Sequence, residues 1–409
     1  MPMKKSFLAL MCTAGMLTFS ACQKDNLGTP NQPGNQQDDS QSATFLAAMG
    51  EDPNADPGNN ANVCKIVWEK GKQPVITKLD GVYDEAWKMM YHTASASNTV
   101  LLYSSASKMQ EAHHVKMKTG GNVPVLIDMA ALTWKVLDFA ITVKDKHTLA
   151  FEENALLAPD GKTIYYAMSE GYEWEWSGTD HFMKYDVATG TKTPIDGALQ
   201  LPEVNKDADG HNINLYAITP DGKYVVGSVS NASYGGFGGW SSDAIVTLFV
   251  YDTQTGQFKP VRADDDCCLS FNSVSFDSQT VYFAQNGSQY KYDIASGSVA
   301  KVDDTFAELV CRLPNHVKLC NGGVLEQGST TNNFLNKIVG DKVENIEWEN
   351  VPYWDGNNSL QFNNARTKVR LLTGTSPRYF IELQSLESDA TVDTLFTLPR
   401  NVGHLVQIR

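Results

Sequence analysis

Beyond its first 21 residues the chain lacks an apolar run long enough to cross a membrane. A spanning helix needs about 20 consecutive apolar residues, whereas the apolar runs of this sequence are short and are separated by Gly, Asn, Asp and Pro. Cationic residues are also scarce, with 33 Lys and Arg against 47 Asp and Glu and a formal net charge of −14. Because nucleic acid and anionic membrane surfaces would repel such a chain, we expect neither as a binding partner.

The sequence also lacks the motifs that mark several large enzyme classes. It contains no HExxH zinc motif, no Walker phosphate loop, no dinucleotide-binding glycine fingerprint and no GxSxG elbow. The segments SASK at 105–108 and KTG at 118–120 imitate penicillin-binding motifs, but they lie close together in strand-like sequence. No catalytic residue can therefore be named from a motif alone.

The first residues have the character of an export signal. A basic start, an apolar run and small residues before Cys22 predict a signal peptide over 1–21. The segment FSAC resembles the lipobox of bacterial lipoproteins, with Phe19 where Leu is commoner, and the resemblance implies that Cys22 is lipidated. Gln23 replaces the Asp that favours retention in the inner membrane, so we expect a lipid anchor in the outer membrane, exposed at the cell surface. The alternative is ordinary secretion, with Cys22 an incidental thiol.

Residues 22–62 are dominated by Asn, Gln, Gly, Pro and Asp. Such a segment has too little apolar content to offset the entropy lost on ordering. We therefore expect a lipidated Cys and flexible linker over 22–62, followed by one folded domain over 63–409.

Three segments of the folded part are similar to one another. They pair ALLAPDGKTIYYAM with HFMKYDVATGTKTPI, LYAITPDGKYVVGSV with TLFVYDTQTGQFKPV, and NSVSFDSQTVYFAQ with SQYKYDIASGSVAKV. Each reads as four strands with a Pro-Asp-Gly type turn and a Thr-Gly or Ser-Gly turn. The turns PDGK and DxxTG resemble those of TolB-type or WD40-like propeller repeats. The fold class is all-β, and the resemblance implies a β-propeller of six or seven four-stranded blades, with seven favoured; a pair of β-sandwiches is the alternative.

Two connections between the second and third strands of a repeat are rich in aromatic residues. Because successive antiparallel strands reverse direction, the segments EGYEWEWSGTD (170–180) and SNASYGGFGGWSSD (230–243) should emerge at the end opposite the recurring PDGK and DxxTG turns. In the third repeat the same connection is a tight hairpin through Asn286-Gly287. We expect ligand-binding residues in the two long connections, although they could instead pack on each other as a lid. The aromatic candidates are Tyr172, Trp174, Trp176, Tyr234, Phe237 and Trp240.

Histidines and acidic residues should lie near the same end. His181 and His211 are candidates for ligand contact, because His181 follows the first aromatic segment and His211 lies in the Asp-rich segment NKDADGHN. The segment NKDADGHN places oxygen-bearing side chains at alternate positions before a glycine, as at the start of a calcium loop. The candidate metal ligands are Asn205, Asp207 and Asp209. Tyr216 stands where an EF-hand has its bidentate Glu, so a solvated polar turn is the alternative.

Five cysteines remain outside the first 22 residues. A turn centred between residues 315 and 316 would place Cys311 opposite Cys320, which predicts a disulfide between them. For Cys64, Cys267 and Cys268 the sequence leaves the pairing open.

These observations suggest a lipid-anchored protein that captures a small-molecule or glycan ligand, such as a ferric siderophore, without catalysis. Propeller lipoproteins similar to this one occur beside outer-membrane transporters, so the resemblance implies a transporter as a partner. Two alternatives stay open, because propellers host several functions. One is a metal-assisted hydrolase or lyase at the propeller channel, and the other is a protein–protein interaction scaffold.

Overall fold

The structure is a computed structural model that describes most of the chain from residue 39 onward. The described ranges are 39–86, 90–94, 98–113, 123–139, 141–143, 146–172, 175–234, 240–264, 269–275, 277–302, 317–320, 323–327, 334–339, 342–347, 361–363, 368–374, 377–385 and 391–408. Within them nearly all regular structure is β-strand, the exceptions being helix α2 (Ser107–His113) and the short 3₁₀ helix η2 (Ala198–Gln200). None of the helices in these ranges has the length and apolar character needed to cross a bilayer.

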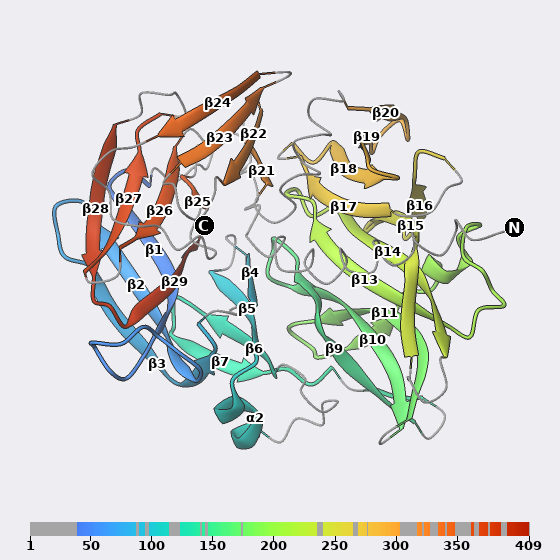
Figure 1. Ribbon diagram of the computed structural model, residues 1–409. Helices are drawn as coiled ribbons and strands as arrows, with labels where there is room; N and C mark the ends of the chain where they lie inside the picture. The colour runs from blue at the N-terminus through green and yellow to red at the C-terminus, as the bar shows by residue number, and fades with distance from the viewer. Residues whose placement is uncertain are drawn as a thin grey trace, which may run out of the picture. The chain divides into compact units, whose positions relative to one another are not determined.

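The chain divides into two compact units. The first contains Asp138–Asn315 and carries the three repeats (Figure 1). Its nine-stranded sheet has the order β16-β15-β14-β13-β11-β10-β9-β8, with β12 paired to β11. The strands of this sheet are β8 (Ile141–Val143), β9 (Lys146–Leu157), β10 (Thr163–Tyr172), β11 (Glu175–Asp186), β12 (Lys192–Pro194), β13 (Gly210–Ile218), β14 (Tyr224–Tyr234), β15 (Trp240–Asp252) and β16 (Phe258–Val261). A four-stranded sheet follows, of β17 (Leu269–Val274), β18 (Thr280–Gln285), β19 (Ser288–Asp293) and β20 (Val299–Lys301).

The repeats predicted from sequence share one pattern of hydrogen bonds. In each repeat the residue after the Asp of the second turn donates its backbone N–H to a carbonyl in the Pro-Asp-Gly type turn. The three bonds run from Val187 to Lys162 at 2.9 Å, from Thr253 to Lys223 at 2.8 Å and from Ile294 to Gln279 at 2.9 Å. Both turns of every repeat therefore lie at the same end of their strands, as strand reversal predicts.

The Asp that opens the second turn has a specific local role. Asp186 Oδ1 accepts the backbone N–H of Thr189 at 2.8 Å and its hydroxyl at 2.9 Å, and these bonds lower the pKa of Asp186. Asp293 makes the equivalent bonds with Ser296, and its pKa is lowered for the same reason. Because the charged carboxylate organises the turn, Asp at this position explains the DxxTG pattern.

The third repeat departs from the pattern at Ser278. Gly161 and Gly222 adopt left-handed backbone conformations, with φ of 68° and 74°, and Ser278 adopts the same conformation with φ of 63°. Its hydroxyl compensates in part, because it accepts the backbone N–H of Asp221 in the preceding repeat at 3.1 Å. A single serine thus replaces the turn glycine and also joins two repeats.

Substitution of Ser278 should separate these two effects. In Ser278→Gly the left-handed strain is relieved, which gains about 1 kcal/mol, but a hydrogen bond of similar value is lost. We expect the free energy of unfolding to change by less than about 1 kcal/mol. Ser278→Val should lose about 2 kcal/mol or more, because a β-branched residue disfavours positive φ. Denaturant unfolding of the two variants checks this, and equal stabilities would refute it.

The second unit contains Pro30–Val115, Asn122–Leu137 and His316–Arg409. Its four sheets are each four-stranded and antiparallel. The first, in the order β29-β1-β2-β3, consists of β1 (Ser42–Met49), β2 (Ala61–Glu69), β3 (Val75–Asp84) and β29 (Val402–Ile408). The second consists of β4 (Met90–Ala94), β5 (Thr99–Ser104), β6 (Val123–Asp128) and β7 (Thr133–Val136). The other two consist of β21 (Val317–Cys320), β22 (Gly323–Gln327), β23 (Phe334–Val339) and β24 (Lys342–Glu347), and of β25 (Gln361–Phe362), β26 (Val369–Thr373), β27 (Arg378–Leu383) and β28 (Val392–Leu398).

Strand β1 corrects the expected linker. Residues 42–49 were expected to belong to the flexible segment 22–62, but they form a strand paired on one side with β2 and on the other with β29. Phe45 and Leu46 are fully buried there. The polar composition of 22–62 as a whole conceals this short apolar strand, which joins the two ends of the chain in one sheet.

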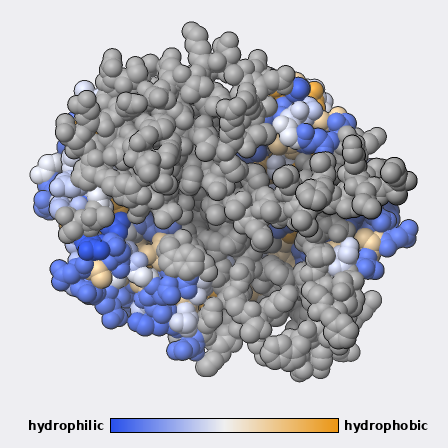
Figure 2. Space-filling model, viewed as in Figure 1, coloured by the Kyte–Doolittle hydropathy of each residue, from blue (hydrophilic) through white to orange (hydrophobic). Residues whose placement is uncertain are grey.

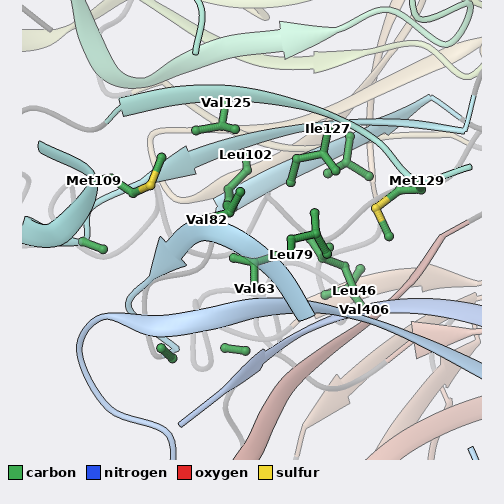
Figure 3. Packing of buried hydrophobic residues seen from close by; sticks show 14 of the residues in the cluster. Leu46, Val63, Leu79, Val82, Leu102, Met109, Val125, Ile127, Met129 and Val406 are labelled. Atoms are coloured by element: carbon green, nitrogen blue, oxygen red, sulfur yellow. The ribbon is translucent and has the colours of Figure 1, made fainter. Parts of the chain in front are cut away.

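The core of the second unit lies between sheets. Figure 3 shows Leu46, Val63 and Leu79 of the first sheet facing Leu102, Val125 and other residues of the second. Cys64, on β2, is a buried free thiol whose Sγ lies 3.4 Å from the carbonyl oxygen of Ala47. Burial raises the pKa of this thiol to about 12, so it has little nucleophilic character.

The described surface is mostly hydrophilic in Figure 2. Among the described residues one large hydrophobic residue is exposed, Val75, which keeps 63% of its maximal solvent-accessible surface. Isolated apolar residues of this kind are normal on a protein surface. The parts of the chain that the structure describes therefore offer no broad apolar patch.

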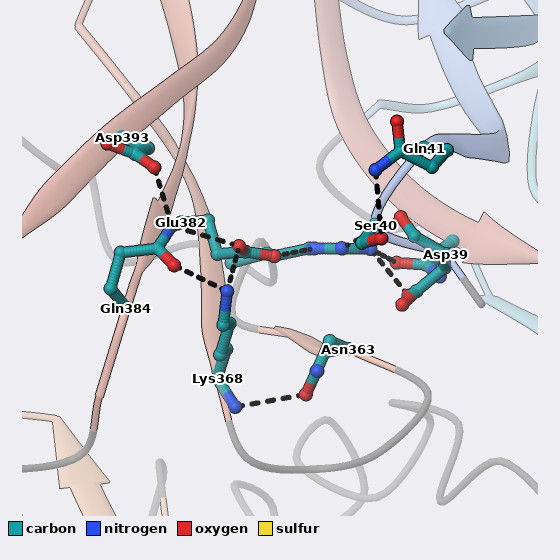
Figure 4. Close-up of polar contacts among 10 residues, drawn as sticks. Asp39, Ser40, Gln41, Asn363, Lys368, Glu382, Gln384 and Asp393 are labelled. Atoms are coloured by element: carbon teal, nitrogen blue, oxygen red, sulfur yellow. Dashed lines mark hydrogen bonds and ion pairs between the residues drawn. The ribbon is translucent and has the colours of Figure 1, made fainter. Parts of the chain in front are cut away.

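A buried ionic network ties the start of the fold to its last strands. Arg370, on β26, is 1% exposed and donates from Nη1 to Asp39 Oδ2 at 2.6 Å and from Nε to Glu382 Oε2 at 2.8 Å. Figure 4 shows Asp39 on one side of the network, with Glu382 and Lys368 on the other. Gln407 of β29 donates to the same Asp39 oxygen at 2.7 Å. Residues at both ends of the chain thus share one buried cation.

A second buried carboxylate, Asp84, has no ion-pair partner among the residues that the structure describes. Asp84 closes β3 and is fully buried, with Oδ1 accepting the backbone N–H groups of Glu85 at 2.8 Å and Ser105 at 3.2 Å. Its Oδ2 has no hydrogen-bond partner among the described residues. Loss of hydration on burial raises the pKa of Asp84 to about 8, so this residue is mostly protonated at neutral pH.

Candidate functional site

The two aromatic segments are long β-hairpins rather than loops. In the first, Gly171 pairs with Trp176 and Tyr172 pairs with Glu175, so β10 and β11 continue to within two residues of each other. In the second, Tyr234 pairs directly with Trp240. Aromatic residues favour extended cross-strand pairs. The two segments therefore continue the strands further than was expected from the sequence.

Sheet topology places both hairpin ends at the same end of the first unit. Strand β10 is antiparallel to β11, β11 is parallel to β13, and β13 is antiparallel to β14. Strands β10 and β14 therefore run in the same direction, and their last residues, Tyr172 and Tyr234, leave the sheet at one end. Figure 1 shows these strands together in the green and yellow part of the ribbon.

The two hairpins separate at His211. Thr179 on β11 and His211 on β13 form the single pairing that the structure records between these strands within its described residues. Because β13 begins at Gly210, it does not accompany β11 any further toward the hairpin end. His211 therefore lies at the point where the two parts of the nine-stranded sheet diverge, β8 to β12 on one side and β13 to β16 on the other.

The imidazole of His211 is held in one tautomer. Its Nε2 lies 2.8 Å from the carbonyl oxygen of Asn205, and the residue as a whole is 9% exposed. A carbonyl oxygen only accepts hydrogen bonds, so Nε2 must carry the proton and the neutral ring has its lone pair on Nδ1. This is the arrangement that a general base requires, because the bonded Nε2–H fixes the ring while Nδ1 accepts the proton.

Two further polar residues accompany His211. Asn231 is its direct cross-strand partner on β14, and the side-chain oxygen of Asn231 is buried without a hydrogen-bond partner among the described residues. Asp180, on β11, is 4% exposed and accepts the backbone N–H of Ile213 through Oδ2 at 2.9 Å. A carboxylate, an imidazole and an amide therefore share this end of the sheet, above an apolar core that includes Ile213 and Phe182.

The acidic segment before His211 has its own internal structure. Asn205 Oδ1 accepts the backbone N–H of Asp207 at 3.0 Å, forming a local turn, and Asn205, Asp207 and Asp209 are all exposed. Among the described residues no three His, Cys, Asp or Glu side chains converge on a point where they could hold a metal ion. Tyr216, which follows the segment, belongs to β13, where its hydroxyl lies 2.8 Å from Ser228 Oγ and its ring stacks on Phe271. An EF-hand geometry does not extend over these residues, since β13 begins at Gly210.

Of the remaining residues predicted from the sequence, some are described by the structure and others are not. His181 follows Asp180 on β11, opposite Met168 and only partly buried. For Tyr172, Trp176, Tyr234 and Trp240 the strand register is described, whereas Trp174, Phe237, Cys22 and Cys311 lie outside the described residues. Cys320 pairs with Gly323 at the end of β21, so the expected disulfide with Cys311 stays a prediction.

The third repeat confirms the expected contrast. Strands β18 and β19 pair up to Gln285 and Ser288, so Asn286 and Gly287 form a two-residue turn with φ of 48° and 76°. These positive values identify the tight hairpin that an Asn-Gly pair predicts. Only the two preceding repeats, among the three described here, therefore carry a long aromatic hairpin.

One residue beside the first hairpin, His147, was not recognised from the sequence. It lies at the start of β9, paired with Gly171 of β10, which in turn pairs with Trp176 of β11. The residues His147, Gly171 and Trp176 therefore form one row across three strands. The sequence gives little indication of this position, because no turn motif before the first repeat shows where β9 begins.

No family model matches the chain, and no curated protein matches it. Similar solved structures include TolB from Acinetobacter baumannii, with 12% identity, a TM-score of 0.39, and coverage of 91% of this chain and 67% of that one. They also include a prolyl endopeptidase, with 12% identity and a TM-score of 0.52 over 94% of this chain. The chain spans about half, 52%, of the length of that endopeptidase. A periplasmic gluconolactonase of Pseudomonas aeruginosa matches at 12% identity and a TM-score of 0.46 over 90% of this chain and 99% of the other.

These comparisons correct the expected function. A non-catalytic ligand-capture protein was predicted, but the similar structures include a gluconolactonase, an oligogalacturonate lyase and a prolyl endopeptidase, which are enzymes. The prediction of capture without catalysis is therefore contradicted, and the alternative of a hydrolase or lyase agrees better. The similarity to the prolyl endopeptidase, at 12% identity, shows the fold alone, which is nearly all-β with several four-stranded antiparallel sheets.

Proposed function

We propose that the protein is a hydrolase or lyase in which His211 acts as the general base. The observation that carries this proposal is the bond between His211 Nε2 and the Asn205 carbonyl oxygen at 2.8 Å, because it leaves Nδ1 as the proton acceptor. The bond also supports the imidazolium that forms after proton transfer, since the carbonyl dipole faces the protonated ring.

The neighbouring groups suit the same chemistry. In a hydrolase, His211 Nδ1 would take a proton from an attacking water; in a lyase, it would take one from the carbon beside the bond that breaks. The buried oxygen of Asn231, opposite His211, would accept a hydrogen bond from the water or from a substrate hydroxyl. Asp180 would keep the start of β13 in place through its bond to Ile213. The polar end of the sheet would thus orient the base and the group it attacks.

The aromatic hairpins would bind the rest of the substrate. In this proposal Tyr172, Trp176, Tyr234 and Trp240 lie on hairpins that leave the sheet at the same end as His211. His181, on β11 beyond the base of the first hairpin, would contribute a further polar group. Because binding energy from remote substrate groups can lower the barrier at the reacting bond, hairpins of this length suit an enzyme of extended substrates.

The metal-assisted form of the reaction is a separate proposal. Asn205, Asp207 and Asp209 carry the oxygen ligands that Ca²⁺ prefers, on the loop whose carbonyl holds His211. An ion there would act mainly by fixing the loop. Dialysis against a chelator, followed by metal analysis and an activity assay, checks this: retained activity without metal would leave His211 as base and exclude the ion.

We also propose the cellular setting and the finer architecture. Lipidation of Cys22 would hold the protein at the outer membrane, exposed at the cell surface, with an outer-membrane transporter as a partner that takes up the product. The nine-stranded sheet divides at the Thr179–His211 pair into two sets, which with the five four-stranded sheets supports a propeller of seven blades. Digestion of intact cells with a protease that cannot enter them would test the surface location, because only a surface-exposed protein would be cleaved.

A turnover assay tests the proposed function. The full mature chain would be incubated with panels of lactones, esters, glycosides, uronides and peptides, and product release would be followed by mass spectrometry. We expect turnover of at least one class and a loss of about a hundredfold in His211→Gln. Gln is the matched replacement, because its amide N–H can still donate to the Asn205 carbonyl while it cannot accept the proton. Absence of turnover in every class, or full activity in His211→Gln, would overturn the proposal.

A further inference from the structure

A row of three residues across β9, β10 and β11 has an unusual composition. His147 pairs with Gly171, and Gly171 pairs with Trp176, next to the end of the first hairpin. Glycine within a strand costs stability, because it adds backbone entropy and no packing, and it often marks a place where a ligand approaches the backbone closely. The row therefore sets a position without a side chain between an imidazole-bearing and an indole-bearing residue.

The second hairpin repeats the aromatic character at the same end of the unit. Tyr234 and Trp240 form its last recorded pair, and Tyr172 pairs with Glu175 one step beyond the row. Aromatic rings stack on flat ring faces, whereas imidazole and carboxylate groups bond to hydroxyls. Because successive residues of a strand lie on opposite faces of the sheet, Tyr172 and Glu175 belong to the face opposite the row, whereas His147 and Trp176 share one face.

We propose that the row His147–Gly171–Trp176 is a binding site for a ring that bears hydroxyl groups. The ring would lie over Gly171, which has no side chain of its own to exclude it, with Trp176 available for the ring face and His147 for a hydroxyl. Sugars and polyphenols share this chemistry, and the test distinguishes them. The inference deepens the proposed function, on which it rests, because it assigns a ring of this type to the substrate.

Isothermal titration calorimetry tests the row directly. The full mature chain would be titrated with cellobiose and maltotriose as sugars, with catechol and gallate as phenols, and with sorbitol as an acyclic polyol. Two variants would be compared with the parent, Trp176→Ala and Gly171→Val. Thr193→Ala is the matched control, since Thr193 is an exposed residue of the same repeat on β12, opposite Lys184 of β11. Circular dichroism would establish that each variant is folded, and Trp176→Ala alone decides the result if Gly171→Val is not.

We expect saturable binding of one ring class, at least tenfold weaker in Trp176→Ala and Gly171→Val and unchanged in Thr193→Ala. Sorbitol should not bind. Equal binding of sorbitol, binding of neither ring class, or row variants that bind as the parent does would each overturn the inference. The two proposals fail separately: ring binding that depends on the row but without turnover overturns the proposed function alone, and turnover without dependence on the row overturns the inference alone.

Discussion

Replacing Arg370 with Met is expected to lower the free energy of unfolding by about 3–5 kcal/mol. The side chain is buried, and its removal leaves Asp39 and Glu382 close to each other without their shared cation. Although burial opposes ionisation of Glu382, the charge of Arg370 and the hydrogen bonds that Glu382 accepts from Arg370 and Lys368 hold the pKa of that carboxyl below its ordinary value. The variant must therefore either bury two carboxylates that have lost their shared cation or take up a proton on folding.

Arg400→Met is the matched control for this prediction. Arg400 also bridges to a carboxylate, Asp56, at 3.1 Å, but both partners are largely exposed. Exposed pairs contribute about 0–1 kcal/mol, so the control should unfold almost as the parent does. Denaturant unfolding, followed by tryptophan fluorescence, measures both variants. Equal stabilities of Arg370→Met and Arg400→Met would show that the buried network does not hold the chain ends together.

Replacing Asp84 with Asn is expected to stabilise the protein at neutral and mildly alkaline pH. The folded-state pKa of about 8 lies well above the ordinary value near 4, so between these values the folded protein holds a proton that the unfolded chain has released. Stability should therefore fall as pH rises from about 4 to about 8, by on the order of 4 kcal/mol at pH 7. Asn avoids this loss, because it is neutral at every pH and its oxygen can still accept the N–H groups of Glu85 and Ser105.

The thermal unfolding midpoint at pH 5 and pH 8 measures this difference. The gain of Asp84→Asn over the parent should be small at pH 5 and large at pH 8. Asp80→Asn is the control on the same strand, where the carboxylate is exposed, and it should change neither midpoint appreciably. A gain at pH 8 no larger than at pH 5 would mean that Asp84 is ionised in the folded protein.

The parts of the fold that sequence could predict are those set by local residues. The paired turns of the three repeats follow from Asp186, Asp293 and their neighbours, whose hydrogen bonds lie within a few residues of each other. The hairpin through Asn286 and Gly287 was predicted for the same reason, since positive φ at two successive positions strongly favours Asn-Gly.

The parts that sequence missed depend on partners far along the chain. Strand β1 is short and Ala-rich, and it is recognisable as a strand only when paired with β29, more than 350 residues later. Arg370 would ordinarily indicate a solvent-facing position, because its anionic partner Asp39 is 331 residues away. No local pattern predicts either feature.

The candidate site was predicted in outline. Strand reversal correctly placed both aromatic segments at one end, but the segments were interpreted as loops, and ligand contact by His211 stays a prediction. The role of His211 at the divergence of two hairpins depends on its pairing with Thr179, across a parallel bridge that no local motif specifies. For the same reason His147 was missed, since only the register of β9 with β10 brings it beside Gly171.

The central claim is that both aromatic hairpins leave one end of the sheet, with His211 where they separate. Dipolar spectroscopy between spin labels on Glu175→Cys and Tyr234→Cys, with the other cysteines replaced, tests it most directly. Strand spacings of about 4.8 Å predict a separation of roughly 10–20 Å before allowance for the labels. Labels on Glu175→Cys and Gln254→Cys, at opposite ends, should instead give roughly 35–40 Å, since a strand of this length rises about 3.3 Å per residue. A long distance for the first pair, similar to that of the second, would contradict the account.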